Sequence, residues 1–280
     1  MRLINEYLLS KDIVKNANKT IEATDETIHD IVIKALDDEG WDADLNNIDV
    51  SKVTKMSGLF AYLSRFNGDI SNWDVSNVTS MDNMFSGCES FNCDISRWNV
   101  EKLKFSNNMF SRCVKFNQDL SSWKISNILQ CGRMFAFCYN FNQNVGDFNF
   151  YSTNDLSGLF LGCENFDQDV SNLLNGKKKT HIVSTFNGCK NFKGKGIEKW
   201  NIASVINANM AFKYCENLDV DISGWDVSSL KSCESMFEGC KSLTCDCSGW
   251  KLDNSFFYFK ENMKKMFFNS GVKKSFRPSV

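Results

Sequence analysis

Cysteine is the residue type with the widest chemistry in this chain, where it occurs 12 times in 280 residues. In a secreted protein such a number would indicate a framework of disulfides. Equivalent cysteines of neighbouring repeats, however, have parallel Cα–Cβ directions, which suit a disulfide poorly. We therefore expect reduced thiols that pack as small apolar residues, with Cys93, Cys245 and Cys247 as the exceptions most able to pair. Seven cysteines recur every 25 or 26 residues: Cys88, Cys113, Cys138, Cys163, Cys189, Cys215 and Cys240.

Metal binding and catalysis find little support among the other reactive residues. The only histidines are His29 and His181, and no two cysteines have the CxxC spacing of a zinc site. No Ser-His-Asp set, paired-carboxylate site or glycine-rich cofactor motif can be assembled. A chain that devotes most positions to repetition has little room for a unique catalytic constellation. We expect no enzyme activity, no cofactor and no metal.

Acidic residues recur at one position of the repeat: Asp69, Asp94, Asp119, Asp169, Asp221 and Asp246. In an alternating strand they would point outward, and Asp69, Asp94 and Asp119 would do so together with the asparagine two residues before each of them. Such a ridge could bind a basic partner or Ca²⁺. In the alternative, to which we give more weight, each aspartate accepts backbone N–H groups at its own corner. The candidate binding residues here are Asn67, Asp69, Asn92, Asp94, Asn117 and Asp119.

A basic run follows Gly176 and provides a second candidate surface. Lys177, Lys178 and Lys179 lack the GxxxxGK[ST] spacing of a phosphate-binding loop, so we expect a solvated loop. Loops on repeat proteins carry the variation that distinguishes one binding surface from another. The three lysines are therefore predicted to contact a partner.

These residues are positioned by an internal repeat. The string FNGDISNWDVSNVTSMDNMFSGCES begins at Phe66, and copies of its first residues follow from Phe91, Phe116, Phe141, Phe166, Phe192, Leu218 and Leu243. A constant period places equivalent residues in columns that bury against one another when the coils stack. The sequence thus predicts about eight coils over residues 43–272. A tryptophan column, which includes Trp73 and Trp98, is predicted to be core rather than a stacking platform.

Each coil is predicted to contain two elements. The Phe-Asn-x-Asp-Ile-Ser segment alternates apolar with polar residues, which indicates a strand in a parallel ladder. Residues 78–88 carry apolar side chains at a spacing typical of a short helix or 3₁₀ turn. The fold class expected is an α/β repeat: a solenoid with a short parallel strand ladder and short helical segments.

The ends differ from the repeat. Residues 1–42 are predicted to form a helical cap, with Thr24 as N-cap, an apolar stripe from Ile28 to Leu36, and Gly40 as the helix stop. Leu3 and Tyr7 fall in a predicted shorter helix before it. A last half-coil ends near residue 272, and residues 273–280 form a basic tail.

The unit WDVSNVTSMDNMFSGCESFNCDIS closely resembles the BspA-type leucine-rich repeat, in the variant common in mycoplasma surface proteins. The resemblance covers residues 43–272. It implies a leucine-rich-repeat-like solenoid, with roles in surface attachment, adhesion to host proteins or other protein–protein contacts. Repeats of this kind also occur in bacteriophage-encoded proteins, so the resemblance implies a cell surface or a virion as the location.

Charge and hydropathy exclude several other classes. The net charge is −2, so no overall field favours nucleic acid or an anionic membrane. No apolar stretch reaches the roughly 18 residues that a membrane span needs. Glu6 interrupts the N-terminal segment and no cleavage site follows, so the sequence as written indicates a cytoplasmic start.

The leading functional prediction is a non-catalytic binding scaffold with a protein partner, and a glycan as the second class of ligand. The alternative is a structural subunit of a larger assembly, such as a phage particle, in which caps or exposed coils pack against copies or another subunit. The identity of the partner and the oligomeric state are left open.

Overall fold

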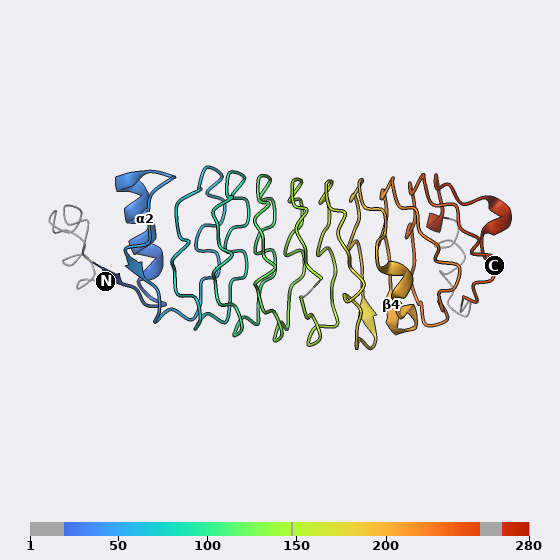
Figure 1. The fold of residues 1–280 in the computed structure, drawn as a ribbon, viewed down its shortest axis with the longest axis horizontal. Coiled ribbons are helices and arrows are strands. Elements are labelled where there is room, and N and C mark those ends of the chain that lie inside the picture. Colours follow the sequence, from blue (N-terminus) through green and yellow to red (C-terminus); the bar gives the residue numbers. More distant parts are fainter. Residues whose placement is uncertain (1–19, 147, 253–264, 280) are drawn as a thin grey trace.

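The computed structural model describes residues 20–146, 148–252 and 265–279. Coils follow one another along the long axis of the molecule, from a helix at the N-terminal end to the C-terminus at the other end (Figure 1). The fold is a repeat solenoid with little regular secondary structure, short parallel strands and a long buried aromatic ladder. The stacked coils predicted from the constant period are therefore confirmed.

The regular elements are short and widely separated. Strand β1 pairs in parallel with β2, and β3 pairs in parallel with β4. Two 3₁₀ helices, η1 and η2, lie just before β4, and η3 lies near the C-terminus. The elements are β1 (Ile21–Glu22), α2 (Ile28–Glu39), β2 (Ile48–Asp49), β3 (Thr180–His181), η1 (Ile197–Lys199), η2 (Ile202–Ser204), β4 (Val205–Asn207) and η3 (Lys274–Phe276).

Helix α2 lies at the N-terminal end of the stack (Figure 1), and its apolar stripe, which includes Ile28 and Leu36, is buried with the core of the solenoid. It ends at Gly40, whose φ of 92° is a value that glycine adopts without strain. It begins one turn later than predicted, with Thr27 as N-cap, because residues 25–27 form a turn in which the N–H of Thr27 donates to the carbonyl of Thr24 at 3.1 Å. The shorter helix predicted around Tyr7 lies outside the described residues.

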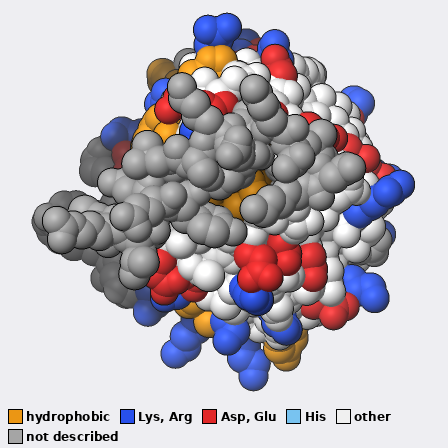
Figure 2. Space-filling model, turned by 90° about the vertical axis from the view of Figure 1, so that its left-hand side faces the viewer, with side chains coloured by type: hydrophobic (Ala, Val, Ile, Leu, Met, Phe, Trp, Pro, Cys, Tyr) orange, Lys and Arg blue, Asp and Glu red, His pale blue; other side chains and the backbone are white. Residues whose placement is uncertain are grey.

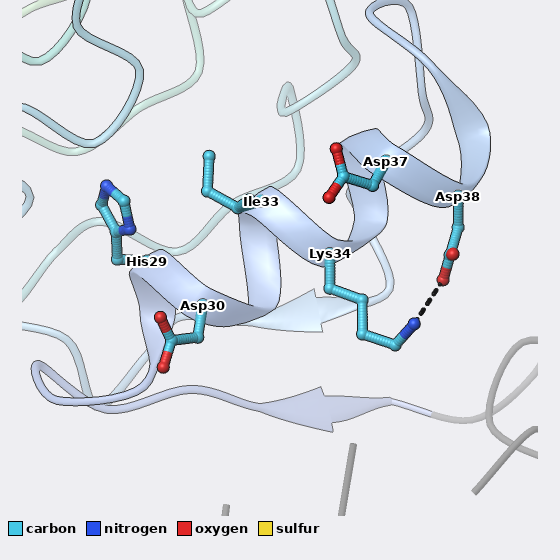
Figure 3. Close-up of a pocket in the computed structure, with 6 residues that line it drawn as sticks. All are labelled: His29, Asp30, Ile33, Lys34, Asp37 and Asp38. Atoms are coloured by element: carbon cyan, nitrogen blue, oxygen red, sulfur yellow. Dashed lines mark hydrogen bonds and ion pairs between the residues drawn. The ribbon is translucent and has the colours of Figure 1, made fainter. Parts of the chain in front are cut away.

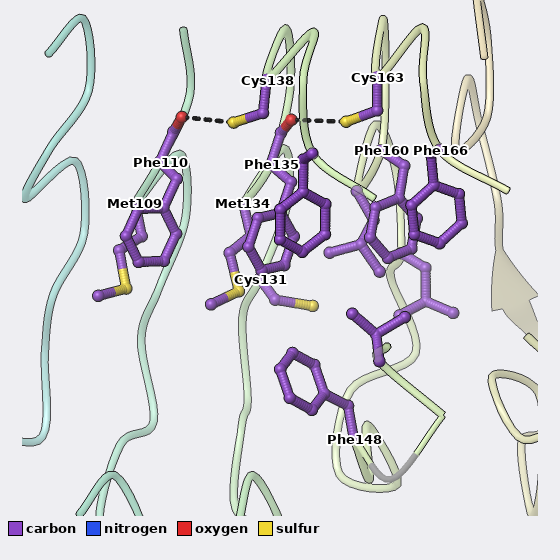
Figure 4. Close-up of a cluster of buried hydrophobic side chains, with 14 of the residues drawn as sticks. Met109, Phe110, Cys131, Met134, Phe135, Cys138, Phe148, Phe160, Cys163 and Phe166 are labelled. Carbon is purple, nitrogen blue, oxygen red and sulfur yellow. Dashed lines mark hydrogen bonds between the residues drawn. The ribbon is translucent and has the colours of Figure 1, made fainter. Parts of the chain in front are cut away.

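Two columns of phenylalanine run through the stack (Figure 4). Within the first column, ring centroids are 5.5 Å apart for Phe85 and Phe110 and 5.6 Å apart for Phe110 and Phe135. From Phe60 to Phe186 each ring also stacks on a ring of the second column, as Phe135 does on Phe141 at 4.4 Å, and in the next two coils leucine takes the second-column position. Offset stacking at these distances adds about 0.5–1.5 kcal/mol per pair to the free energy of burial. The aromatic columns are thus the continuous core of the protein.

Residues 78–88 form a ribbon of turns, so of the short helix or 3₁₀ turn predicted there the helix is wrong. Asn83 and Gly87 have left-handed φ values of 57° and 78°, which interrupt a helix. Local turns close through the N–H groups of Met84, Ser86 and Cys88. The alternate N–H groups donate to carbonyls of the next coil: Met81 to Phe105, Asn83 to Asn107, Phe85 to Met109 and Gly87 to Ser111. The backbone is therefore satisfied between coils rather than within a helix.

The parallel ladder lies on a different part of the coil from the one predicted. Past the first coil, where Asp44 bridges Asp69, the Phe-Asn-x-Asp-Ile-Ser segments contain no strand in the described residues. Their backbones are instead joined through asparagine side chains. The parallel bridges fall just before the turn ribbon, between Lys55 and Ser80, Ser80 and Phe105, Phe105 and Gln130, Asp155 and His181, and Asn207 and Ser232.

Candidate functional site

The predicted asparagines form a side-chain ladder along the stack. Each Asn Oδ1 accepts the backbone N–H of the equivalent residue in the next coil, from Asn92 to Asn67 at 2.8 Å and from Asn117 to Asn92 at 2.9 Å. The ladder continues with Asn142, whose N–H donates to Asn117. The side chains are exposed, yet their carbonyl groups hold neighbouring coils in register. Their first role is structural.

The predicted aspartates each close a turn in their own coil, as in the alternative given more weight above. The N–H two residues later donates to the carboxylate and holds the pKa of Asp69, Asp94 and Asp119 below its ordinary value. The three side chains are exposed and lie in consecutive coils. The bonds run from Ser71 to Asp69 at 2.9 Å, from Ser96 to Asp94 at 2.9 Å and from Ser121 to Asp119 at 2.8 Å.

The charge of this column differs along the molecule. Asp169 is paired with Lys195 of the next coil at 3.8 Å, so this lysine partly neutralises the charge of the Asp169 carboxylate. Among the ion pairs of the described residues, none involves Asp69, Asp94 or Asp119. We name these three residues the acidic ridge. It presents three negative charges in a fixed register.

The basic run does not form one surface, and the expectation of a solvated loop is wrong for Lys177. That residue is 5% exposed, and its amine donates to the carbonyl oxygens of Phe150 and Thr153. It takes the place that Thr153 occupies in the preceding coil, so its stem fills a core position. Lys178 and Lys179 are exposed. The shortened step between coils, 24 residues from Thr153 to Lys177, turned the first lysine inward.

Replacement of the buried lysine by methionine is expected to stabilise the fold. Burial lowers the pKa of Lys177 to about 8 from an ordinary value of 10.5, so the unfolded chain binds more protons between these values. The contribution of Lys177 to the free energy of unfolding should then rise with pH through this window, whereas the buried thiols, whose pKa values are raised, make the wild type and the variant alike less stable as the unfolded chain ionises. The variant K177M should be more stable than the wild type by about 1–3 kcal/mol at pH 7, and this difference should shrink toward pH 10, as measured by urea unfolding of both proteins from pH 7 to 10.

The variant K178M serves as the control, because Lys178 is exposed. The free energy of unfolding of K178M should depend on pH as that of the wild type does. A K177M protein that is less stable than the wild type at pH 7 would contradict a net cost of the buried charge.

The cysteine column uses its thiols as hydrogen-bond donors. Each Sγ–H donates to the carbonyl of the buried phenylalanine of the preceding coil, as Cys138 does to Phe110 at 2.9 Å and Cys163 to Phe135 at 3.0 Å (Figure 4). Burial raises the pKa of these thiols, to about 12 for Cys88, so they are poor nucleophiles. All twelve cysteines are free in the structure.

The tryptophan column is buried, and its indole N–H groups likewise donate to carbonyls of the preceding coil. The indole N–H of Trp73 donates to the carbonyl of Leu45 at 2.9 Å, and that of Trp98 donates to Ile70 at 3.2 Å. With 3–4% of their surface exposed, these rings cannot stack on a ligand. The prediction that this column is core is confirmed.

Two shallow hollows were not predicted from the sequence. One lies on the outward side of α2, between His29, Asp30, Lys34 and Asp38, where Lys34 pairs with Asp38 at 2.8 Å (Figure 3). Acidic side chains also gather on the described part of this end of the molecule (Figure 2). Asp30, Lys34 and Asp38 are spaced four residues apart, which places them on one face of the helix, and this spacing could have indicated the hollow from the sequence.

The second hollow is lined by Gln130, Asp155, Lys179 and His181, at the edge of the bridge column. With Asn107, which also lines it, the hollow joins residues from four successive coils. In the part of the chain that the structure describes, no three His, Cys, Asp or Glu side chains gather in a way that could hold a metal ion. Over the same residues, no helix is both long and apolar enough to cross a membrane.

The repeat stretch has a counterpart among known families. Residues 33–148, 107–181 and 154–277 each match the family described as "Mycoplasma protein of unknown function, DUF285". Comparisons with curated proteins and with solved structures gave no match. The three overlapping segments together extend over most of the chain, which belongs to the DUF285 family.

Proposed function

We propose that this protein is a non-catalytic, adhesin-like binding scaffold of the BspA-type leucine-rich-repeat class, which recognises a basic protein surface through the acidic ridge. The rigid stack supports the proposal, because contacts held in register by the asparagine ladder need little ordering on binding. Other reactive side chains, including the column thiols and the indole N–H groups, are committed to bonds between coils.

The observation that carries the proposal is the presence of asparagine at one position of the aspartate column. Asn144 Oδ1 accepts the N–H of Gly146 at 2.8 Å, which is the bond that each aspartate makes in its own coil. The turn therefore needs an oxygen acceptor and does not need a negative charge. Like charges in adjacent coils repel one another. The charges of Asp69, Asp94 and Asp119 are thus available for binding.

A protein partner fits this surface better than a glycan. The side-chain amide donors beside the ridge are used within the stack, since Gln118 Nε2 donates to the carbonyl of Asn92 at 2.8 Å and Gln143 Nε2 to that of Asn117 at 3.0 Å. Sugar hydroxyls would compete for groups that are already bonded. Cationic side chains would meet carboxylates that retain free lone pairs and carry full charge.

The triple substitution D69N/D94N/D119N tests the proposal, because asparagine keeps the turn acceptor and removes the charge. Binding of a short oligolysine peptide, followed by titration calorimetry, should weaken by about tenfold at low salt. The natural partner, captured from cells of the source organism, should be lost in the same variant. The free energy of unfolding at pH 7 should change by less than about 0.5 kcal/mol.

A matched control removes the same number of charges from the same column elsewhere, as D169N/D221N/D246N. It should leave peptide affinity within about twofold of the wild type.

Because the pKa values of the ridge carboxyl groups are lowered in the folded state, the stabilising effect of these carboxylates is present near neutral pH and lost in acid. The ridge variant should therefore lose less stability than the wild type on acidification. Equal affinities of wild type and ridge variant would refute the proposed surface.

A further inference from the structure

Cys245 and Cys247 differ from the seven cysteines of the buried column. They lie two residues apart in the coil that starts at Leu243, with their Sγ atoms 3.5 Å apart. Cys245 is partly exposed, whereas Cys247 is buried at the position of Ile222 in the preceding coil. This is the one contact between two thiols recorded among the described residues. The sequence indicated these two cysteines, together with Cys93, as the ones most able to pair, and it did not indicate which of the three lie together.

The two thiols polarise each other. The hydrogen bond from Cys247 lowers the pKa of Cys245 to about 7, in spite of burial and of the nearby Asp221 carboxylate. The same interaction, with burial and the charges of Asp246 and Asp221, raises the pKa of Cys247. Cys245 is thus the thiol of the pair that ionises more readily and is partly ionised at neutral pH, and Cys247 is the proton donor that stabilises its thiolate.

Cys93 occupies the same position of the repeat as Cys245 and lacks a thiol partner at the equivalent of Cys247, where its coil has Ile95. Burial raises the pKa of Cys93 to about 11. The comparison isolates the effect of the second thiol, because both cysteines are partly exposed and lie beside aspartates of the same column.

We propose that Cys245 and Cys247 form a redox-active dithiol, which exchanges with small-molecule disulfides such as glutathione disulfide to give an internal disulfide. The Cys245 thiolate attacks one sulfur of the glutathione disulfide, which forms a mixed disulfide and releases one glutathione thiolate. The Cys247 thiol then loses its proton and attacks the Cys245 sulfur, which releases the second glutathione. Two thiols are oxidised and one glutathione disulfide is reduced, with two electrons transferred.

The mixed disulfide removes the obstacle to the second step. The interaction with Cys245 is the largest cause of the raised pKa of Cys247, and it ends once Cys245 carries a glutathionyl group. A ring closed by cysteines two residues apart is tight, which makes a disulfide easier to reduce. The pair therefore has the character of a reversible exchange site rather than of a structural crosslink.

Peptide mapping tests the proposal directly on the whole folded chain. Trypsin releases residues 242–251 as a peptide that contains both thiols and no other cysteine. After the protein is treated with glutathione disulfide and the remaining thiols are alkylated under denaturant, this peptide should lack both alkyl groups and be lighter by two hydrogens. The peptide of residues 66–97, which contains Cys88 and Cys93, should be fully alkylated.

Two variants separate the steps. C247A should stop at a glutathionyl adduct on Cys245, formed more slowly at pH 7 because the thiolate has lost its donor. C245A should give no adduct on Cys247, and C93A should react as the wild type does. Reduction with dithiothreitol should restore both alkylation sites. Full alkylation of residues 242–251 after the same treatment, in a protein whose circular dichroism shows it folded, would overturn the proposal.

Discussion

The variant F135A is expected to lose about 3–5 kcal/mol of unfolding free energy, which is the cost of removing a buried phenylalanine and leaving a cavity. Phe135 is fully buried, and its ring stacks on Phe110 at 5.6 Å, on Phe160 at 5.7 Å and on Phe141 at 4.4 Å. A cavity at this position interrupts the aromatic core in the middle of the stack. Urea unfolding followed by far-ultraviolet circular dichroism measures the loss.

Tyr139 provides a matched control in the same coil, because it is 41% exposed. The variant Y139A should change the unfolding free energy by less than about 1 kcal/mol. Because each coil contacts its neighbours, F135A should also broaden the unfolding transition, as the two halves of the stack become less coupled. Similar losses for the two variants would show that the core is not organised around the phenylalanine columns.

The variant G196A is expected to lose about 3 kcal/mol or more, through two effects that act together. Gly196 has a left-handed φ of 96°, which costs alanine about 1–2 kcal/mol. A Cβ at this position would lie 2.4 Å from the backbone nitrogen of Ser171 and 2.7 Å from Asp169 Oδ1. Backbone atoms cannot rotate away, so the coil before it must shift, at a cost typical of overpacking.

The control for backbone conformation is G58A, because Gly58 also has a left-handed φ, of 69°, and an added Cβ meets nothing within 4 Å. It should lose about 1 kcal/mol. The difference between the two variants in urea unfolding measures the close approach of consecutive coils at Gly196. If G196A and G58A lose the same free energy, the close approach has no energetic weight.

The arrangement of coils was predictable because the repeat period is nearly constant. Residues such as Phe85, Phe110 and Phe135 recur at one interval, and burial of chemically equal side chains leaves few ways to stack them. The corner role of Asp69 was also predictable, since the Asp-x-Ser spacing is local and independent of the rest of the fold.

The interior of each coil was not predictable in the same way. An apolar side chain at every third or fourth residue fits a helix, and it fits equally a ribbon of turns whose inward residues face the core. The left-handed conformation of Asn83 and Arg133 decides between them, and nothing in the residue types requires it. Bonds to the next coil stabilise that conformation, so it is a property of the stack.

The candidate surfaces were predicted in part. The ridge residues lie exposed and in register, as their column implied, although their hydrogen bonds are structural. Lys177 was misplaced because the step from the preceding coil shortens there by one residue, which moves a nominal loop position into the core. The contact of Cys245 with Cys247 required coordinates, because the conformation of this non-strand segment determines whether side chains two residues apart meet.

The bonds between coils have one further consequence, for the way such a protein can change length. Backbone N–H groups of one turn ribbon donate to carbonyls of the next ribbon, and the thiols and indoles of each coil donate to carbonyls of the coil before it. Every middle coil therefore presents the same kind of donors and acceptors to its two neighbours. An in-frame duplication or deletion of 25 codons would join two compatible faces and leave both ends unchanged. A gene of this kind can therefore vary the reach of its product in whole steps, by recombination between its own copies.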